Sequence, residues 1–222
     1  MSHAVALQNH STRRDSYFSV AARGPMLDRV YSLRYRSYSE EGYINKCSSR
    51  KFMDEFDARE NCTSYLTYHD NELVGSIRAC VYMPGNDGVV PVSEVFEDEI
   101  RDNVNLDAPV VEANKFVVSP SFQKKGGLRG RFSVFKNIVD HVLDINAKTI
   151  LIAVRPEHVD FYKILYFSRM SEEKSYPHLS FKTILLKCDD IEALRARIWG
   201  KLGLNISEVA EQNDAVLNYR AN

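Results

Sequence analysis

The stretch from Val110 to Phe135 constrains the fold more than any other part of the chain. Its sequence is VVEANKFVVSPSFQKKGGLRGRFSVF, an apolar run that carries one acid, Glu112, and one base, Lys115. The run breaks at Pro120 and opens into a cationic, glycine-rich loop, which an apolar-periodic helix follows directly. A strand, a glycine loop and a helix N-terminus in this order form an anion cradle, because N–H groups and the helix dipole converge. The stretch therefore predicts a phosphate site beside an extended backbone.

The loop itself carries the groups that would hold such an anion. Three glycines let backbone N–H groups converge, and side chains around them add further donors. A surface turn with a solvated basic patch is the alternative interpretation. The residues concerned are Gln123, Lys124, Lys125, Gly126, Gly127, Arg129 and Gly130.

Composition excludes several classes of protein. The chain has 222 residues and a formal net charge of -1, which favours one sizeable domain and no binding to nucleic acid. The four cysteines form no Cys-x-x-Cys pair and the six histidines show no ligand spacing, so we expect no metal and no disulfide scaffold. Cys62 and Cys80 are expected to be core thiols. No apolar segment is long enough to span a bilayer, and we expect a cytoplasmic location.

Periodicity predicts a mixed α/β fold, with a central twisted sheet flanked by helices. Residues 1–16 are expected to be a disordered N-terminal segment, 17–188 the main domain and 189–222 a C-terminal helical extension. Expected strands cover 17–22, 63–68, 73–83, 110–118, 149–154 and 181–187. Expected helices cover 26–42, 128–145, 157–167 and 189–204, with a further helix at 206–218 and a short acidic element at 92–101.

Two motifs resemble the GCN5-related N-acetyltransferase (GNAT) superfamily. The order Val118-x-Pro120-x-x-Gln123-x-x-Gly126-Gly127 after a strand resembles that superfamily's acyl-donor loop. The segment 158–167, HVDFYKILYF, resembles its "FYxxLGF" helix. The chain departs from the family pattern at Leu128, where Gly or Ala is usual, and at Tyr166, where Gly is usual. The resemblance implies a GNAT-like single domain that binds an activated acyl donor.

The N-terminal half narrows this resemblance. LRYRxY at 33–38, DEFD at 54–57, LVGSIR at 73–78 and EANKF at 112–116 are similar to the charged framework of acyl-homoserine-lactone synthases. Lys115 stands where that family has Arg, and Lys cannot form the bidentate fork. The fuller match, over about 27–187, is to the related N-acyl amino acid synthases. The resemblance therefore favours an enzyme that joins a fatty acyl chain to an amino acid such as tyrosine.

That chemistry assigns expected roles to named residues. The amine must be neutral to attack, and burial in an apolar strand would raise the pKa of Glu112 toward that of a useful base; a structural ion pair with Arg34, Arg78 or Lys115 is the alternative. The resemblance implies that the backbone at Phe116, Val117 and Val118 binds the thioester oxygen. It also matches Tyr162 to the family's proton donor to the leaving thiolate, with a core aromatic as the alternative.

The remaining charged residues are expected to shape the acceptor pocket, or to form a salt-bridge cluster that stabilises the fold. They are Arg34, Tyr38, Asp54, Asp57, Arg78 and Lys115. Five cations and no acid between 123 and 136 suit an acidic acyl carrier protein, whose phosphopantetheine arm needs one phosphate site. We expect this donor rather than coenzyme A, and no permanently bound cofactor. Alternative functions are a lactone autoinducer synthase, an acetyl-coenzyme A-dependent acetyltransferase and a non-catalytic acyl-ligand sensor.

Overall fold

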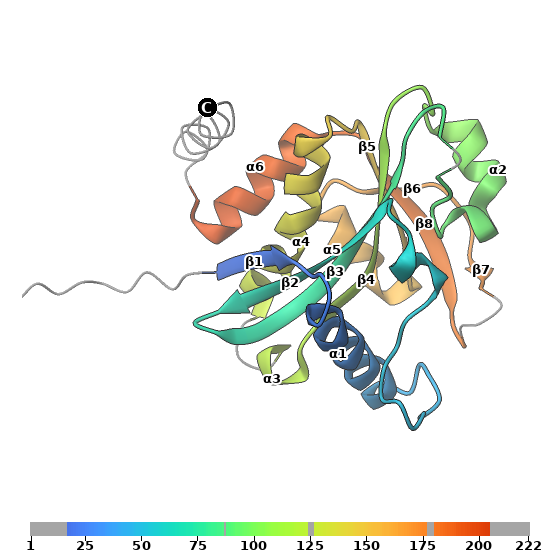
Figure 1. Cartoon of the computed structure of the whole chain (residues 1–222). Coiled ribbons are helices and arrows are strands. Elements are labelled where there is room, and N and C mark those ends of the chain that lie inside the picture. Colours follow the sequence, from blue (N-terminus) through green and yellow to red (C-terminus); the bar gives the residue numbers. More distant parts are fainter. Residues whose placement is uncertain (1–16, 87, 124–126, 177–179, 205–222) are drawn as a thin grey trace, which may run out of the picture.

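A single twisted sheet organises the computed structural model, which describes residues 17–86, 88–123, 127–176 and 180–204 (Figure 1). The strand order is β1-β2-β3-β4-β5-β8-β6, and β7 pairs with β8. Every pairing is antiparallel except that of β4 with β5. The strands are β1 (Tyr17–Ala21), β2 (Cys62–His69), β3 (Glu72–Tyr82), β4 (Val110–Val118), β5 (Thr149–Val154), β6 (Ser168–Arg169), β7 (Lys174–Ser175) and β8 (Lys182–Cys188).

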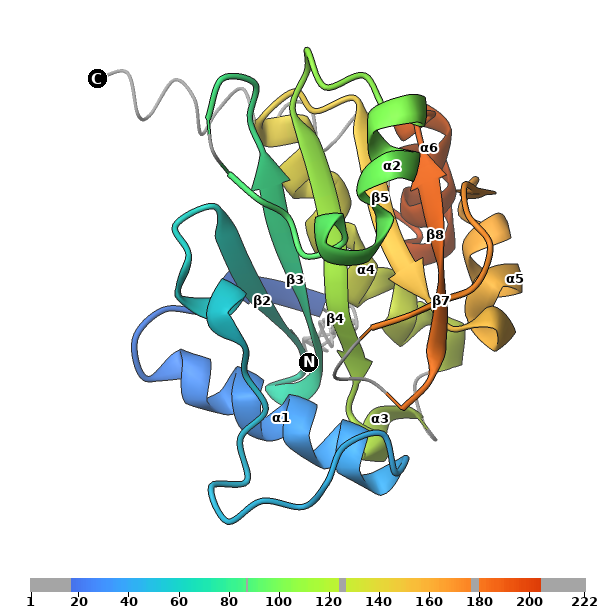
Figure 2. The same ribbon diagram turned by 90° about the vertical axis from the view of Figure 1, so that its right-hand side faces the viewer.

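Helices cover both faces of the sheet, which confirms the predicted fold class. In Figure 2, α1 and α2 lie on the near side of the strands and α4 and α6 lie behind them. Side chains of α4, α5 and α6 share one hydrophobic core with the sheet, while those of α2 form a second core on the opposite face. The helices are α1 (Met26–Glu40), α2 (Ser93–Asn103), α3 (Pro120–Gln123), α4 (Gly127–Asp144), α5 (Val159–Lys163) and α6 (Ile191–Leu202), with short 3₁₀ turns η1 (Glu55–Ala58) and η2 (Pro156–His158).

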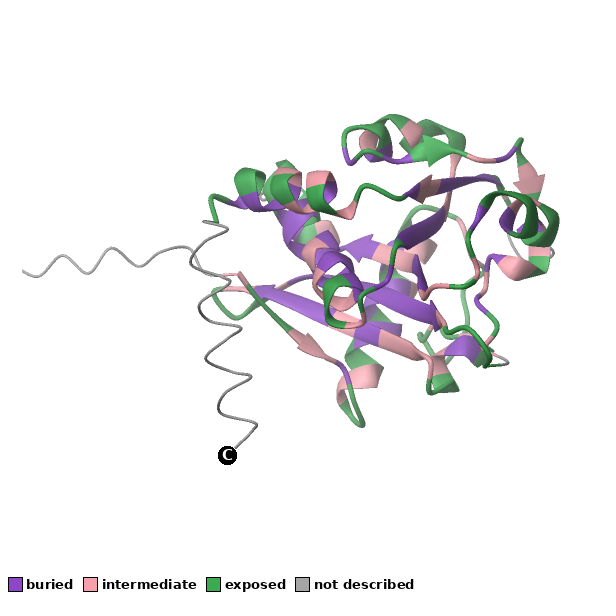
Figure 3. Ribbon diagram, turned by 90° about the horizontal axis from the view of Figure 1, so that it is seen from above, coloured by how far each residue is buried: buried purple, intermediate pink, exposed green. Residues whose placement is uncertain are grey.

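Successive side chains of a strand point to opposite faces of the sheet, and this decides which side chains of β4 are available for chemistry. Val111 and Ala113 of β4 face the larger core against α4, as the period of two requires. Glu112 and Asn114 therefore lie on the opposite face, the one that α1 and α2 partly cover. Figure 3 shows buried residues gathered in the strands and exposed residues on the outer faces of the helices. The polar groups of β4 are thus directed into a protected space.

Two irregularities open that space. β4 and β5 pair only over Val110–Glu112 and Thr149–Leu151, and beyond this point the two strands separate (Figure 2). On the other side of β4, the register with β3 shifts between Ser76 and Arg78. This is a β-bulge, in which two residues of β4 lie opposite one residue of β3 and the extra residue bends the strand. Lys115 lies in the bulge with a left-handed φ of 50°.

Close backbone approach fixes the bulge in place. A Cβ atom on Gly75 would lie 2.3 Å from the carbonyl oxygen of Val117, so β3 meets β4 here without room for any side chain. The hydrogen bond from the Ser119 N–H to the Val74 carbonyl, 2.7 Å, ties the end of β4 to the same point. The strand therefore leaves the sheet in one defined direction.

The predicted elements match the structure closely, with one clear exception. The strands expected at 110–118 and 149–154 are β4 and β5 with the same limits. The helix expected at 157–167 was wrong in extent, because η2 and α5 together end at Lys163 and Tyr166 adopts a left-handed φ of 61°. The short elements α3, β6 and β7 were not predicted. The expectations for 1–16 and 206–218 lie outside the described residues.

Candidate active site

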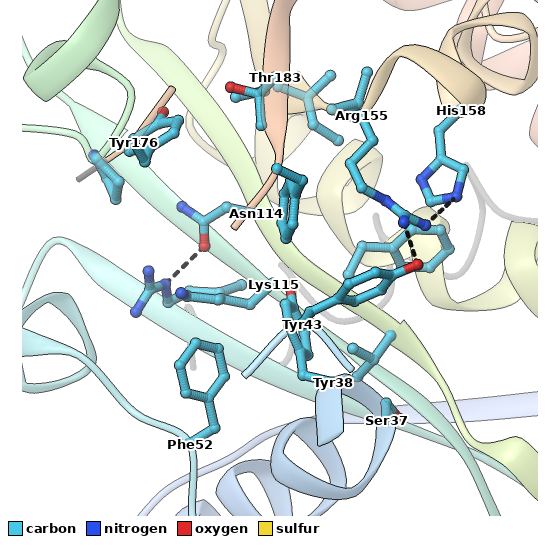
Figure 4. Close-up of a pocket in the computed structure, with 18 of the residues that line it drawn as sticks. Ser37, Tyr38, Tyr43, Phe52, Asn114, Lys115, Arg155, His158, Tyr176 and Thr183 are labelled. Carbon is cyan, nitrogen blue, oxygen red and sulfur yellow. Dashed lines mark hydrogen bonds between the residues drawn. The ribbon is translucent and has the colours of Figure 1, made fainter. Parts of the chain in front are cut away.

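A cavity of about 650 Å³ lies where β4 and β5 separate (Figure 4). Residues of β4 and β5 form its floor, α1 and the segment before η1 form one wall, and α5 and the start of β8 form the other. About half of the lining residues are apolar or aromatic, and the others are polar or charged. Such a composition is typical of pockets for small organic molecules.

Glu112 is the buried carboxyl group of this cavity. Its side chain is 2% exposed, and its two oxygens accept hydrogen bonds of 2.8 Å from the Val92 N–H and the Asn114 amide. Burial raises its pKa to about 7, although both hydrogen bonds oppose the rise. Within the described residues no basic side chain forms an ion pair with Glu112. The geometry therefore gives a carboxyl group that can gain or lose a proton near neutral pH.

Asn114 connects this acid to a charge network. Its amide nitrogen donates to Glu112, and its oxygen accepts a 2.7 Å hydrogen bond from the Arg78 Nε atom (Figure 4). Arg78 is fully buried and also binds both carboxylate oxygens of Asp54, at 2.5 and 3.1 Å. The paired guanidinium and the Lys115 ammonium hold the pKa of Asp54 well below its usual range, against the effect of burial.

A second group of charged residues, which does not line the cavity, holds Arg78 and Asp54 in place. Arg34 of α1, on the apolar stripe of its helix, is fully buried and donates to Asp57 at 2.7 Å and to the Ser64 hydroxyl at 2.8 Å. Asp57 also lies 3.0 Å from Arg78. Arg34 and Asp57 do not line the cavity, whereas Arg78 and Asp54 do. The network fixes η1 and the loop that follows α1 against the sheet.

Lys115 of β4 and Tyr38 of α1 both line the cavity beside Phe52. The Lys115 ammonium lies 3.0 Å from an Asp54 oxygen and 4.5 Å from the centre of the Phe52 ring. Tyr38 of α1 packs against the same ring, with 5.0 Å between centroids. Together these residues make an aromatic wall with one cation.

The predicted thioester site lies at the other end of the cavity. Phe116, Val117 and Val118 line it. Phe116 lies in the bulge, and Val117 and Val118 pair with β3 just after it, whereas β5 no longer pairs with β4 beyond Glu112. Tyr162 of α5 also lines it; its ring is 4% exposed and packs 6.0 Å from Phe135. Burial raises the pKa of Tyr162, so its hydroxyl keeps its proton.

The predicted donor loop is only partly brought to the cavity. Gln123 lines it and donates to the Val118 carbonyl at 3.0 Å. Gly127 starts α4 with a left-handed φ of 51°, and Gly130 packs against Phe122. Arg129 is directed elsewhere, because it donates to the carbonyl of Leu202 at the end of α6. Lys124, Lys125 and Gly126 lie outside the described residues.

Sequence reasoning missed the residues that close the cavity. Tyr43 and Arg155 meet across its mouth, where the guanidinium donates to the phenol oxygen and lies over the Tyr43 ring (Figure 4). His158 completes this group, 3.0 Å from Arg155. Tyr176 lies near Glu112, and Arg131 of α4, one of the five cations counted between 123 and 136, also lines the cavity. Tyr43, Arg155 and Tyr176 come from separate parts of the sequence and lie outside the predicted motifs, so only the fold brings them together.

Two negative findings concern the described part of the chain. None of its clusters of His, Cys, Asp and Glu has the arrangement to hold a metal ion. None of its helices is both long and apolar enough to cross a membrane.

Several solved structures share the fold of this chain. The structure of FeeM, an N-acyl amino acid synthase from uncultured soil microbes, aligns with a TM-score of 0.67 at 16% identity, over 86% of this chain and all of that one. BjaI, a coenzyme A-dependent acyl-homoserine-lactone synthase, aligns with a TM-score of 0.64 at 14% identity, over 86% of this chain and 90% of that one. LasI, another acyl-homoserine-lactone synthase, gives 0.63 at 11%, over 84% of this chain and 96% of that one. These likenesses confirm the GNAT-like fold.

The family follows from a sequence model. The model of the N-acyl amino acid synthase FeeM matches residues 29–189, which include both the charge network and the donor loop. No curated protein is similar enough in sequence to count as a relative. The chain belongs to the FeeM family of N-acyl amino acid synthases, and it is therefore an N-acyltransferase. The predicted family is thus confirmed.

Proposed function

We propose that the chain transfers a long-chain fatty acyl group from acyl carrier protein to the amine of an amino acid with a tyrosine-like side chain. One observation carries the proposal. A single cavity runs from the buried carboxyl group of Glu112 to the backbone of Phe116 to Val118 and on to Gln123. An acceptor amine at one end and a thioester at the other would meet within it.

Glu112 would serve as the base that frees the amine. The pKa of Glu112 is raised from an ordinary 4.5 to about 7, which brings it closer to that of an amine. At about 1.4 kcal/mol for each pH unit, this shift makes proton transfer from the amine easier by about 3 kcal/mol than it would be to an ordinary carboxylate. The buried position therefore suits the reaction better than a solvated carboxylate would.

The thioester end would stabilise charge as it develops. Backbone N–H groups near Phe116 to Val118 would donate to the carbonyl oxygen, because β5 has separated from β4 at this point and no longer pairs with it. Tyr162 would donate a hydrogen bond to the departing sulfur. A thiol titrates near 8.5, below the raised pKa of this phenol, so Tyr162 stabilises the thiolate without giving up its proton.

The acceptor would occupy the wall formed by α1 and the loop after it. Tyr38, Tyr43 and Phe52 provide aromatic faces there, and Lys115 provides a cation for an amino acid carboxylate. Asp54 and Arg78 hold Lys115 and the floor of the site in place. The supports for a tyrosine-like acceptor are this aromatic lining and the family.

The proposal that acyl carrier protein supplies the acyl group is supported by the positive charge near the donor loop. Arg131 lines the end of the cavity beyond Tyr162, and Lys124 and Lys125 precede α4 in the sequence. An acidic carrier protein complements such a cluster, and its arm brings one phosphate to the start of α4. Transfer from a carrier protein of fatty acid synthesis also agrees with the expected cytoplasmic location.

A direct assay tests the proposal. The purified full chain is incubated with tyrosine and palmitoyl groups carried either by acyl carrier protein or by coenzyme A, and products are identified by mass spectrometry. We expect N-acyl tyrosine, formed with a kcat/KM about tenfold or more higher from the carrier protein. A lactone formed from S-adenosylmethionine instead would show a homoserine-lactone synthase. A product from acetyl-coenzyme A alone would show an ordinary acetyltransferase.

Substitution of the base tests the mechanism. Glu112→Gln should lower kcat at least about a hundredfold, because it keeps the size of the side chain and removes the base. Glu97→Gln is the matched control, since Glu97 is exposed on α2 away from the cavity. Full turnover by Glu112→Gln would exclude Glu112 as the base while leaving the N-acyltransferase reaction intact.

A further inference from the structure

Two cysteine thiols face each other beside the candidate active site. Cys62 of β2 and Cys80 of β3 are direct partners in the antiparallel register, so both side chains lie on the same face of the sheet. The neighbouring pair, Asn61 and Val81, carries the backbone hydrogen bond, 2.9 Å from the Val81 N–H to the Asn61 carbonyl. Hydrogen-bonded and non-hydrogen-bonded pairs alternate along a ladder, so Cys62 and Cys80 form a non-hydrogen-bonded pair.

The Cα separation expected for this pair is compatible with a disulfide bond. Cα atoms of non-hydrogen-bonded partners lie about 4.5 Å apart, at the short end of the range that disulfides span. Cys80 is fully buried, whereas Cys62 is partly exposed and accessible to a small molecule. A hydrogen bond from the Cys80 thiol lowers the pKa of Cys62, which favours the reactive thiolate.

The same pair touches the group that positions the base. The Asn114 amide nitrogen lies 3.6 Å from the Cys80 sulfur and 2.8 Å from a Glu112 oxygen. The two hydrogens of that amide thus go to Cys80 and Glu112, while its oxygen accepts from Arg78. A bond between the two sulfurs would draw the Cys80 sulfur toward Cys62 and weaken one of the three contacts that orient Asn114.

We propose that Cys62 and Cys80 are a reversible oxidation site, which a hydroperoxide converts into a cross-strand disulfide that loosens Asn114 and slows turnover. The Cys62 thiol releases its proton, and the thiolate attacks one oxygen of hydrogen peroxide. The O–O bond breaks, and the departing hydroxide takes up that proton, which gives a sulfenic acid and water. The Cys80 sulfur then attacks that sulfur, the S–O bond breaks, and the thiol proton leaves with the hydroxyl group as water. Two thiols lose two electrons and one peroxide becomes two waters; a thiol reductant reverses the change.

Peptide mass spectrometry tests the site without any need for activity. The full chain is treated with hydrogen peroxide, alkylated and digested with trypsin, which separates peptide 60–78 from peptide 79–101. We expect the two peptides to be joined, with a mass two hydrogens below their sum, and separate after dithiothreitol. If both cysteines are instead alkylated while the exposed Cys47 is oxidised in the same sample, the site does not exist.

Turnover tests the consequence, which rests on the proposed function. We expect oxidation to lower kcat about fivefold or more, as loss of one positioning hydrogen bond would, and dithiothreitol to restore it. Cys62→Ser should be insensitive to peroxide, whereas the matched control Cys47→Ser should respond like the parent chain. A joined peptide with unchanged kcat would refute the effect on Asn114. A chain that forms the disulfide but makes no N-acyl amino acid would refute the proposed function and leave the oxidation site standing.

Discussion

Glu112→Gln should stabilise the folded chain at alkaline pH and destabilise it at acid pH. Burial raises the pKa of Glu112 from an ordinary 4.5 to about 7, so the folded state holds this proton more tightly than the unfolded state. The resulting stability is fully present below pH 4.5 and is lost as pH rises through about 7. Glutamine does not titrate, so the variant lacks this loss.

The magnitude follows from the two pKa values. At about 1.4 kcal/mol for each pH unit, the ionised carboxylate destabilises the folded chain by about 3 kcal/mol at pH 8.5 and by about 1 kcal/mol at pH 5. The substitution also destabilises the folded variant by an amount that does not depend on pH. The cause is that either the Val92 N–H or the Asn114 amide must face the new NH₂ group, which cannot accept a hydrogen bond. This loss of stability is about 1–3 kcal/mol at every pH. Between pH 5 and pH 8.5, the free energy of unfolding of the variant should therefore rise by about 2–3 kcal/mol relative to that of the parent.

Urea unfolding at pH 5 and pH 8.5 measures this change. The slope of free energy against urea should stay the same for both proteins, since the surface exposed on unfolding is the same. Glu97→Gln, on the exposed face of α2, should differ from the parent by less than about 0.5 kcal/mol at either pH. An equal loss of stability in Glu112→Gln at both pH values would show that the carboxyl group does not hold its proton to neutral pH.

Three further substitutions test other parts of the structure. Arg78→Met should lower the free energy of unfolding by about 3–5 kcal/mol in urea, because it leaves the Asp54 carboxylate without its buried partner. Gly75→Ala should cost about 1–3 kcal/mol or more and lower Tm in calorimetry, because its Cβ atom would lie 2.3 Å from the Val117 carbonyl oxygen. Tyr162→Phe should lower kcat about tenfold to a hundredfold through loss of one hydrogen bond to the departing thiolate, with KM for the acceptor little changed. Unchanged stability in the first two variants, or unchanged kcat in the third, would contradict the contacts assigned here.

Local patterns in the sequence were sufficient to predict most of the helices and strands. β5 follows a continuous apolar run buried on both faces, so its limits could be predicted to the residue. The helix expected at 157–167 ended early because Tyr166 takes a left-handed conformation that only glycine adopts without strain. The related motif has glycine at this position. The Tyr166 hydroxyl instead accepts a 2.8 Å hydrogen bond from Arg197 of α6, a contact between segments that no local pattern reveals.

In the candidate site, too, some properties could be predicted from the local sequence, and others depend on contacts between distant segments. An acid in an apolar strand indicates burial, so the direction of the Glu112 pKa could be predicted from β4 alone. Its value depends on two donors, and the one from Val92 comes from the start of α2, twenty residues earlier. Desolvation without these hydrogen bonds would raise the pKa further and leave the carboxyl group protonated, unable to accept a proton from an amine. The pKa of Glu112, the proposed base, therefore depends on Val92 and Asn114 as well as on burial, and neither residue was among the predicted site residues.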